Sequence, residues 1–121
     1  MRTALFGILV LASLALGAGS ATAALSCTVQ QSSCPGVELF RISGQQNAHA
    51  ELAGQGNYQY RVCCSGVPDL GNQCSGTPGT DYAVVLKLSS VTNAHVEMAT
   101  QANYPERACL QVTQWAQQTD C

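Results

Sequence analysis

Apolar and polar residues alternate with a period of two in several short stretches of the chain. Phe40 and Ile42 alternate with Arg41 and Ser43, and the same alternation returns over residues 84–89. Successive side chains of a strand point to opposite faces of a sheet, so this period predicts strands that each have one apolar face. The predicted strands are 37–43, 48–52 and 58–64, followed by 84–89, 94–98 and 104–110.

The last three of these strands repeat the first three. Residues 37–64, moved forward by 46 positions, align with residues 83–110 without a gap, and 11 of the 28 pairs are identical. Unrelated segments of this length would share about two residues. The longest shared motif is Asn-Ala-His-x-Glu, at 47–51 and 93–97, and in both copies Asn-Tyr, Arg and Cys follow it. The repeat predicts two halves of equivalent structure.

Turn-forming residues separate the strands within each half. In the first copy, residues 44–47 and the glycine-rich residues 53–57 are such breaks. Each half is therefore predicted to be a three-stranded antiparallel meander, which is marginal alone, and two of them packed face to face would share one core. The predicted fold is an all-β, disulfide-stabilised antiparallel β-sandwich built from two pseudo-symmetric three-stranded repeats. We expect residues 65–80 to be a linker loop and residues 24–35 to include a short edge strand.

The beginning of the chain has the features of an export signal. Arg2 precedes an uncharged apolar run over 4–16, and Ala21-Thr22-Ala23 fits a small-x-small cleavage site. The run is shorter than a bilayer span, which argues against the alternative of an uncleaved anchor. A lipoprotein acylated at Cys27 is the other alternative, and its surroundings match that signal poorly. We expect a signal peptide at 1–23 and a single secreted domain at 24–121, located extracellularly or at the cell surface.

Charge and composition narrow the classes of partner. After the predicted cleavage four basic and seven acidic residues remain, which gives a net charge of −3. The chain therefore lacks the excess of basic residues that is typical of proteins that bind nucleic acid. No membrane segment is expected after signal cleavage. The polar but weakly charged surface suits a protein that touches copies of itself, and it equally suits an ordinary secreted domain.

All seven cysteines follow the predicted cleavage site, and none belongs to a C-x-x-C pair. Export to an oxidising compartment favours disulfides over metal thiolates for such a set. Cys63 and Cys64 are neighbours on a strand, so they point to opposite faces and need different partners. The predicted pairs are Cys64–Cys74, Cys34–Cys63 and Cys109–Cys121, and Cys27 is the candidate for a bond between subunits.

The series Asn-Ala-His-x-Glu, Asn-Tyr and a strand ending in Cys resembles tandem repeats of uncharacterised large secreted proteins from environmental bacteria and archaea. The resemblance covers 56 of the 98 residues after the predicted signal. It implies a secreted, extracellular β module built from repeats, and it implies no catalytic activity. Because this chain has two copies behind its own signal, we expect a free-standing subunit.

The repeated histidine and glutamate are the candidate metal ligands. His49 and Glu51 share a strand face, as do His95 and Glu97, and imidazole with carboxylate suits Zn²⁺ or Cu²⁺. The structural interpretation is preferred: the two glutamates would form cross-strand ion pairs, Glu51 with Arg41 and Glu97 with Lys87, while Asn and His fix the turn. No cofactor is expected.

No catalytic signature accompanies these motifs. The chain lacks G-x-S-x-G and a P-loop, both histidines belong to the repeat, and Glu51 and Glu97 are too symmetric for glycoside hydrolysis. Aromatic residues offer an alternative sugar-stacking platform. They are Tyr58, Tyr60, Tyr82, Tyr104 and Trp115. The sequence does not predict an enzyme.

The sequence favours a secreted structural protein, the self-assembling subunit of an extracellular filament or surface layer. Its expected partners are copies of itself, because sheet edges accept an added strand from a neighbour. The expected contact inserts the 24–35 arm into an adjacent subunit. The alternative is a secreted module that binds a metal through the two His-x-Glu pairs, or glycans through the aromatic residues. Glycans or the cell surface are the other partners considered.

Overall fold

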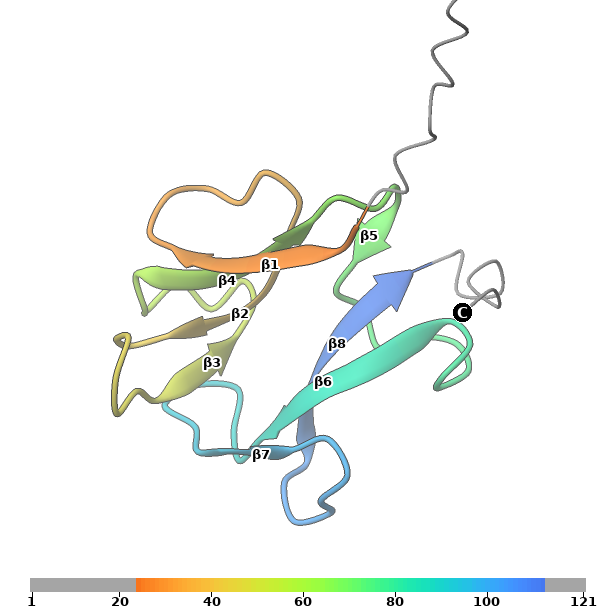
Figure 1. The fold of residues 1–121 in the computed structure, drawn as a ribbon. Helices are drawn as coiled ribbons and strands as arrows, with labels where there is room; N and C mark the ends of the chain where they lie inside the picture. Colours follow the sequence, from red (N-terminus) through yellow and green to blue (C-terminus); the bar gives the residue numbers. More distant parts are fainter. Residues whose placement is uncertain (1–23, 113–121) are drawn as a thin grey trace, which may run out of the picture.

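The computed structural model describes residues 24–112, which form two four-stranded antiparallel sheets without a helix (Figure 1). The first sheet has the strand order β1-β4-β2-β3 and the second β5-β8-β6-β7. The bounds are β1 Ser26–Gln30, β2 Val37–Ile42, β3 Ala50–Leu52, β4 Tyr60–Ser65, β5 Leu70–Gly71, β6 Tyr82–Leu88, β7 Val96–Met98 and β8 Glu106–Val112. The all-β, sandwich-like fold predicted from the alternation is confirmed.

The two sheets follow one plan, in which β2, β3 and β4 correspond to β6, β7 and β8. The meander predicted for each half is wrong, because β2 lies between β3 and β4 and pairs with both, as β6 pairs with both β7 and β8. β3 has only three residues and therefore offers few backbone groups for pairing with β4. β2 has six residues and pairs with β4 along most of its length. The predicted linker loop also contains a strand, β5, which pairs with β8.

The core lies between the two sheets and is made from the inward face of each. Phe40 and Cys64 from the first sheet and Leu88 and Leu110 from the second belong to one cluster of buried side chains. A β-bulge interrupts β2 between Glu38 and Phe40 and β6 at the corresponding place. In β2 this bulge lets the adjacent Leu39 and Phe40 both be buried.

Residues 24–112 form three disulfides, namely Cys27–Cys64, Cys34–Cys63 and Cys74–Cys109. Of the predicted pairs, Cys34–Cys63 is confirmed, and Cys63 and Cys64 do take different partners. Cys64–Cys74 and Cys109–Cys121 are wrong, and Cys27 is not left for a bond between subunits. Pairing of β1 with β4 places Cys27 directly opposite Cys64, with 4.1 Å between their Cα atoms. Cys121 lies outside the described residues.

The predicted N-terminal edge strand is β1, and it belongs to its own sheet. All five of its residues pair with β4. Cys27–Cys64 then closes a separation of 37 residues, and a crosslink of this kind stabilises a fold by about 2–4 kcal/mol. Insertion of this arm into an adjacent subunit would have to break both the ladder and the disulfide, so the arm contact expected from the sequence does not fit this structure.

Candidate functional site

The first residue of each Asn-Ala-His-x-Glu motif makes the turn that precedes β3 or β7. Asn47 and Asn93 have φ angles of 48° and 47°, in the left-handed region that asparagine tolerates better than most residues. Beside the turn, the backbone N–H of Ser43 donates to the carbonyl of His49, and the Ser43 hydroxyl accepts from the His49 N–H at 3.0 Å. The second repeat makes the same two bonds, so this part of the motif is structural.

The motif glutamates hold the loop that begins with Asn-Tyr. The Glu51 carboxylate is fully buried and accepts hydrogen bonds from the Asn57 N–H at 2.9 Å, the Asn57 amide at 2.9 Å and the Tyr58 N–H at 2.8 Å. Glu97 accepts from the Asn103 amide and the Tyr104 N–H in the same way. The loop therefore closes on a carboxylate, which explains why Glu and Asn-Tyr recur together in both repeats.

The cross-strand ion pairs expected from the sequence are not formed, although the predicted register is correct. Glu51 lies opposite Arg41 and Glu97 opposite Lys87. Arg41 instead donates from Nε to Glu38 at 2.6 Å, and this hydrogen bond to a carboxylate raises the pKa of its guanidinium above the usual value. The glutamates turn to their loops because several backbone and amide donors satisfy a buried carboxylate better than one cation does.

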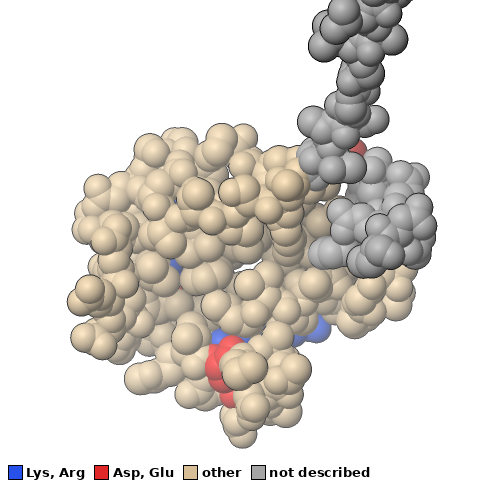
Figure 2. Space-filling view, in the orientation of Figure 1, with Lys and Arg blue, Asp and Glu red and all other residues tan. Residues whose placement is uncertain are grey.

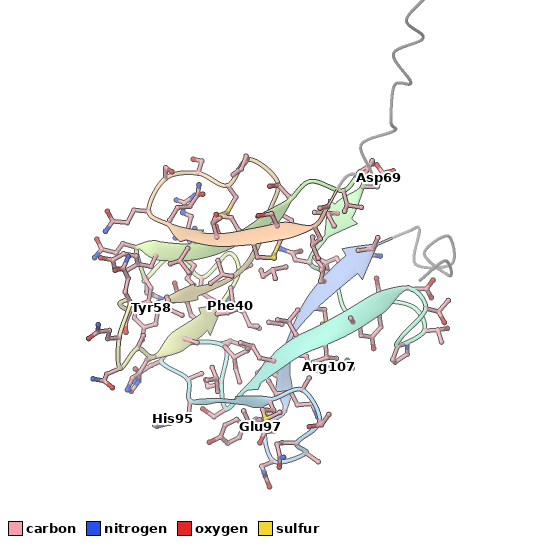
Figure 3. All side chains as sticks on the ribbon, in the orientation of Figure 1. Phe40, Tyr58, Asp69, His95, Glu97 and Arg107 are labelled. Carbon is pink, nitrogen blue, oxygen red and sulfur yellow. A yellow bond between two sulfur atoms is a disulfide. The ribbon has the colours of Figure 1, made fainter. Side chains whose placement is uncertain are left out.

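The two motif histidines lie side by side where the sheets join. Figure 3 labels one of them, His95. Their ring centroids are 5.2 Å apart, next to a mutual backbone pairing of Ala50 with Ala94 at 3.0 and 2.8 Å. The side-chain oxygen of Asn93 contacts His49 Nδ1 at 2.7 Å and accepts from the Tyr58 hydroxyl. An amide oxygen only accepts, so the Nδ1 of His49 is the donor in this contact.

The predicted metal set of His49, Glu51, His95 and Glu97 is assembled only in part. The histidines approach one another, but each glutamate is engaged by its own loop. Within residues 24–112, no group of three or more His, Cys, Asp or Glu side chains is arranged to hold a metal ion. The geometry offers two imidazoles at most, so the structural interpretation of the glutamates is the better one.

Two of the aromatic residues considered for the alternative sugar-stacking platform, Tyr58 and Tyr82, are engaged within the fold. Tyr82 is buried, and its hydroxyl accepts from Arg107 Nη1 at 3.1 Å while the guanidinium lies 5.8 Å from its ring centroid. Tyr58 is engaged with Asn93. Trp115 lies outside the described residues.

One cavity of about 640 Å³, which the sequence did not predict, lies where β2, the linker and β8 come together. Its charged lining is Glu38, Arg41 and Arg107, and Asn72 of the linker donates to the Glu38 carbonyl at 2.8 Å. Glu38 is paired with Arg41, and Arg107 with Tyr82. The charged groups that line the cavity are therefore already partnered within the fold. Its lining comes from four separate segments, 38–41, 52–54, 72–75 and 107–108, so no sequence motif marks the cavity.

The structural role of the buried Glu51 carboxylate can be tested with Glu97, its equivalent in the second repeat, as the control. Glu51→Gln should lower the free energy of unfolding by about 1–3 kcal/mol, because an amide NH₂ would face donors that now bond a carboxylate oxygen. Glu97→Gln changes the equivalent but more exposed residue and should cost less. Chemical denaturation of both variants measures the difference. Equal losses, or no loss for Glu51→Gln, would contradict the structural role given to this residue.

Chelation tests the metal hypothesis. A chelator should leave the melting temperature unchanged, because the glutamates serve the loops and not a metal. A bound metal at 100 times its Kd would add about 2.7 kcal/mol, and its removal would lower the melting temperature by several degrees. A drop on chelation that disappears in a His49→Ala/His95→Ala variant would show that the histidine pair binds metal.

No family model, no curated protein and no solved structure matches this chain. The resemblance of its repeat to those of large secreted proteins therefore stays a prediction. Function has to be inferred from the residues and contacts of this chain itself.

Proposed function

We propose that this protein is a secreted structural protein whose copies assemble into an extracellular filament or surface layer. The observation that carries this proposal is a pair of sheet edges, β1 and β7, that expose both backbone and large apolar side chains. Leu25 and Val29 of the β1 edge are 43% and 46% exposed, and Val96 and Met98 of β7 are exposed as well. Exposed edges of this kind are templates for pairing with another chain.

These edges lack the usual guards against association. Natural proteins protect edge strands with proline, or with lysine and other charged residues. β1 has neither charge nor proline, and the one charge of β7, Glu97, is already bound to its own loop. Nothing in their composition therefore opposes pairing with another strand.

The remaining surface is weakly charged, which also favours association. Charged residues make up 10% of the chain. Uncharged residues cover most of the face in Figure 2, and the few charges lie mainly at one end of it. Copies of this chain would therefore approach one another with little electrostatic repulsion.

Disulfides fit the proposed location. Three disulfides in the described segment indicate that the chain folds in an oxidising environment. None of its residues belongs to a helix long and apolar enough to span a bilayer. Together with the signal expected at 1–23, the disulfides support export to the extracellular side. Outside the cell no ATP is at hand, so assembly would run on strand pairing and apolar burial.

A metal-binding module is the second candidate function, and the histidine pair is the observation that favours it. Nδ1 of His49 is bonded to Asn93, so Nε2 is the ring nitrogen that could face a metal, and the His95 ring lies beside it. Two imidazoles without a carboxylate make a weak site, which places this function second.

Electron microscopy of the secreted protein tests the proposed function. We expect polymers of uniform width that form from the purified chain without added metal or nucleotide. A single-chain mass by light scattering at millimolar concentration would contradict the proposal.

A further inference from the structure

We infer that β7 of one copy pairs with β1 of a second copy, so that the second sheet of one subunit continues into the first sheet of the next. This inference rests on the proposed self-assembly and names its contact. It follows from a difference between the two repeats: the edge of the first repeat is covered within the chain, and the equivalent edge of the second is not.

The covered edge is β3. The N–H groups of Ala50 and Leu52 point away from β2 and donate to the carbonyls of Ala94 and Val91, at 3.0 and 2.9 Å. The segment that precedes β7 thus serves as an added strand for the first sheet. Ala50 is only 1% exposed beneath it.

The uncovered edge is β7. Ser89 and His95 bond as Ser43 and His49 do, so the alternation of the antiparallel ladder directs the N–H groups of Val96 and Met98 away from β6. The turn at 45–48 corresponds to the segment that covers β3, but within residues 24–112 it makes no such pairing with β7. Val96 is 50% exposed and Met98 70%.

The strand that suits this edge is β1 of a second copy. β3 is occupied, and β5 has two residues, too few to form a useful ladder. β1 is five residues long and lies at the free edge of the first sheet, beside β4. One extended edge therefore remains in each sheet, and the two differ in sequence.

The apolar side chains of the two edges match in position. Val29 lies opposite Val62, and the alternation puts Leu25 and Val29 on the inward face of the first sheet. Val96 and Met98 lie opposite Leu88 and Leu86, on the inward face of the second. When two edges pair, side chains on the same face become neighbours, so the four exposed apolar residues would form one strip and shield one another.

The contact is heterologous because β7 and β1 are different surfaces. Each added copy presents a new free β7 or β1, so the contact propagates into a fibre unless the rotation between subunits closes a ring. β1 keeps its ladder and the Cys27–Cys64 disulfide throughout, so no arm has to leave its own subunit.

The test uses the full secreted chain with one edge blocked at a time. Met98→Lys places a charge on the β7 edge, and Val29→Lys places one on the β1 edge. Val85→Lys is the matched control, because Val85 is 41% exposed but lies on the internal strand β6. Mass spectrometry of the disulfides and the melting temperature confirm the fold. Val96→Lys and Leu25→Lys replace either edge variant that fails these checks.

We expect the unmodified chain and Val85→Lys to polymerise, and each edge variant alone to have the mass of one chain. A mixture of Met98→Lys with Val29→Lys should give a complex of two chains and nothing larger, because each variant supplies the edge that the other lacks.

Three other outcomes would overturn the inference in distinguishable ways. Polymers from either edge variant would exclude that edge, while the proposed self-assembly would stand. Two-chain complexes of Val29→Lys alone would show that β7 pairs with itself. An unmodified chain that stays monomeric would overturn the proposed function together with this contact.

Discussion

The structure depends on a short backbone pairing between Ala50 and Ala94, which joins the two sheets. Each residue donates to the carbonyl of the other, and both are buried. Such close pairing suits small side chains, and alanine stands in both positions. The pairing covers the outer edge of β3 and brings His49 beside His95. It leaves β7 paired on one side only, with β6, at the edge of its sheet (Figure 1). The exposed surface of the second repeat is therefore a consequence of how the first repeat is covered.

The repeated polar residues build the scaffold on which this pairing rests. Asn47 and Asn93 supply the left-handed turn, and Glu51 and Glu97 close the loop before β4 or β8. A buried carboxylate is costly unless donors surround it, and Glu51 has three. Residues that serve catalysis or metal binding in other proteins are thus used here to fix the backbone.

Local sequence was sufficient for much of the fold. Alternation over 37–43 predicted β2, and the adjacency of Cys63 and Cys64 predicted their separate partners. The order of strands was not predictable, because the choice of β2 over β3 as the partner of β4 depends on how far each ladder extends. The disulfides Cys27–Cys64 and Cys74–Cys109 were not predicted for the same reason. Each depends on where a strand or the linker lies in the fold, and not on the spacing of cysteines along the chain.

The candidate site was predictable in its members but not in its geometry. Spacing placed His49 and Glu51 on one strand face, but it did not show that Glu51 would turn to the Asn57 loop. The sequence also did not show that the edge of β3 is covered and the equivalent edge of β7 is not. Val96 and Ala50 occupy equivalent, apolar positions, and only the packing shows that one is covered and the other is open. Burial by a neighbouring segment is a property of the whole fold.

Amide hydrogen exchange at the two equivalent edges tests the central claim most directly. In dilute monomer, the N–H groups of Ala50 and Leu52 should exchange slowly, and those of Val96 and Met98 should exchange rapidly. In the assembled protein all four should be protected. Rapid exchange at Val96 and Met98 in the assembly, or equal protection of both edges in the monomer, would contradict the account.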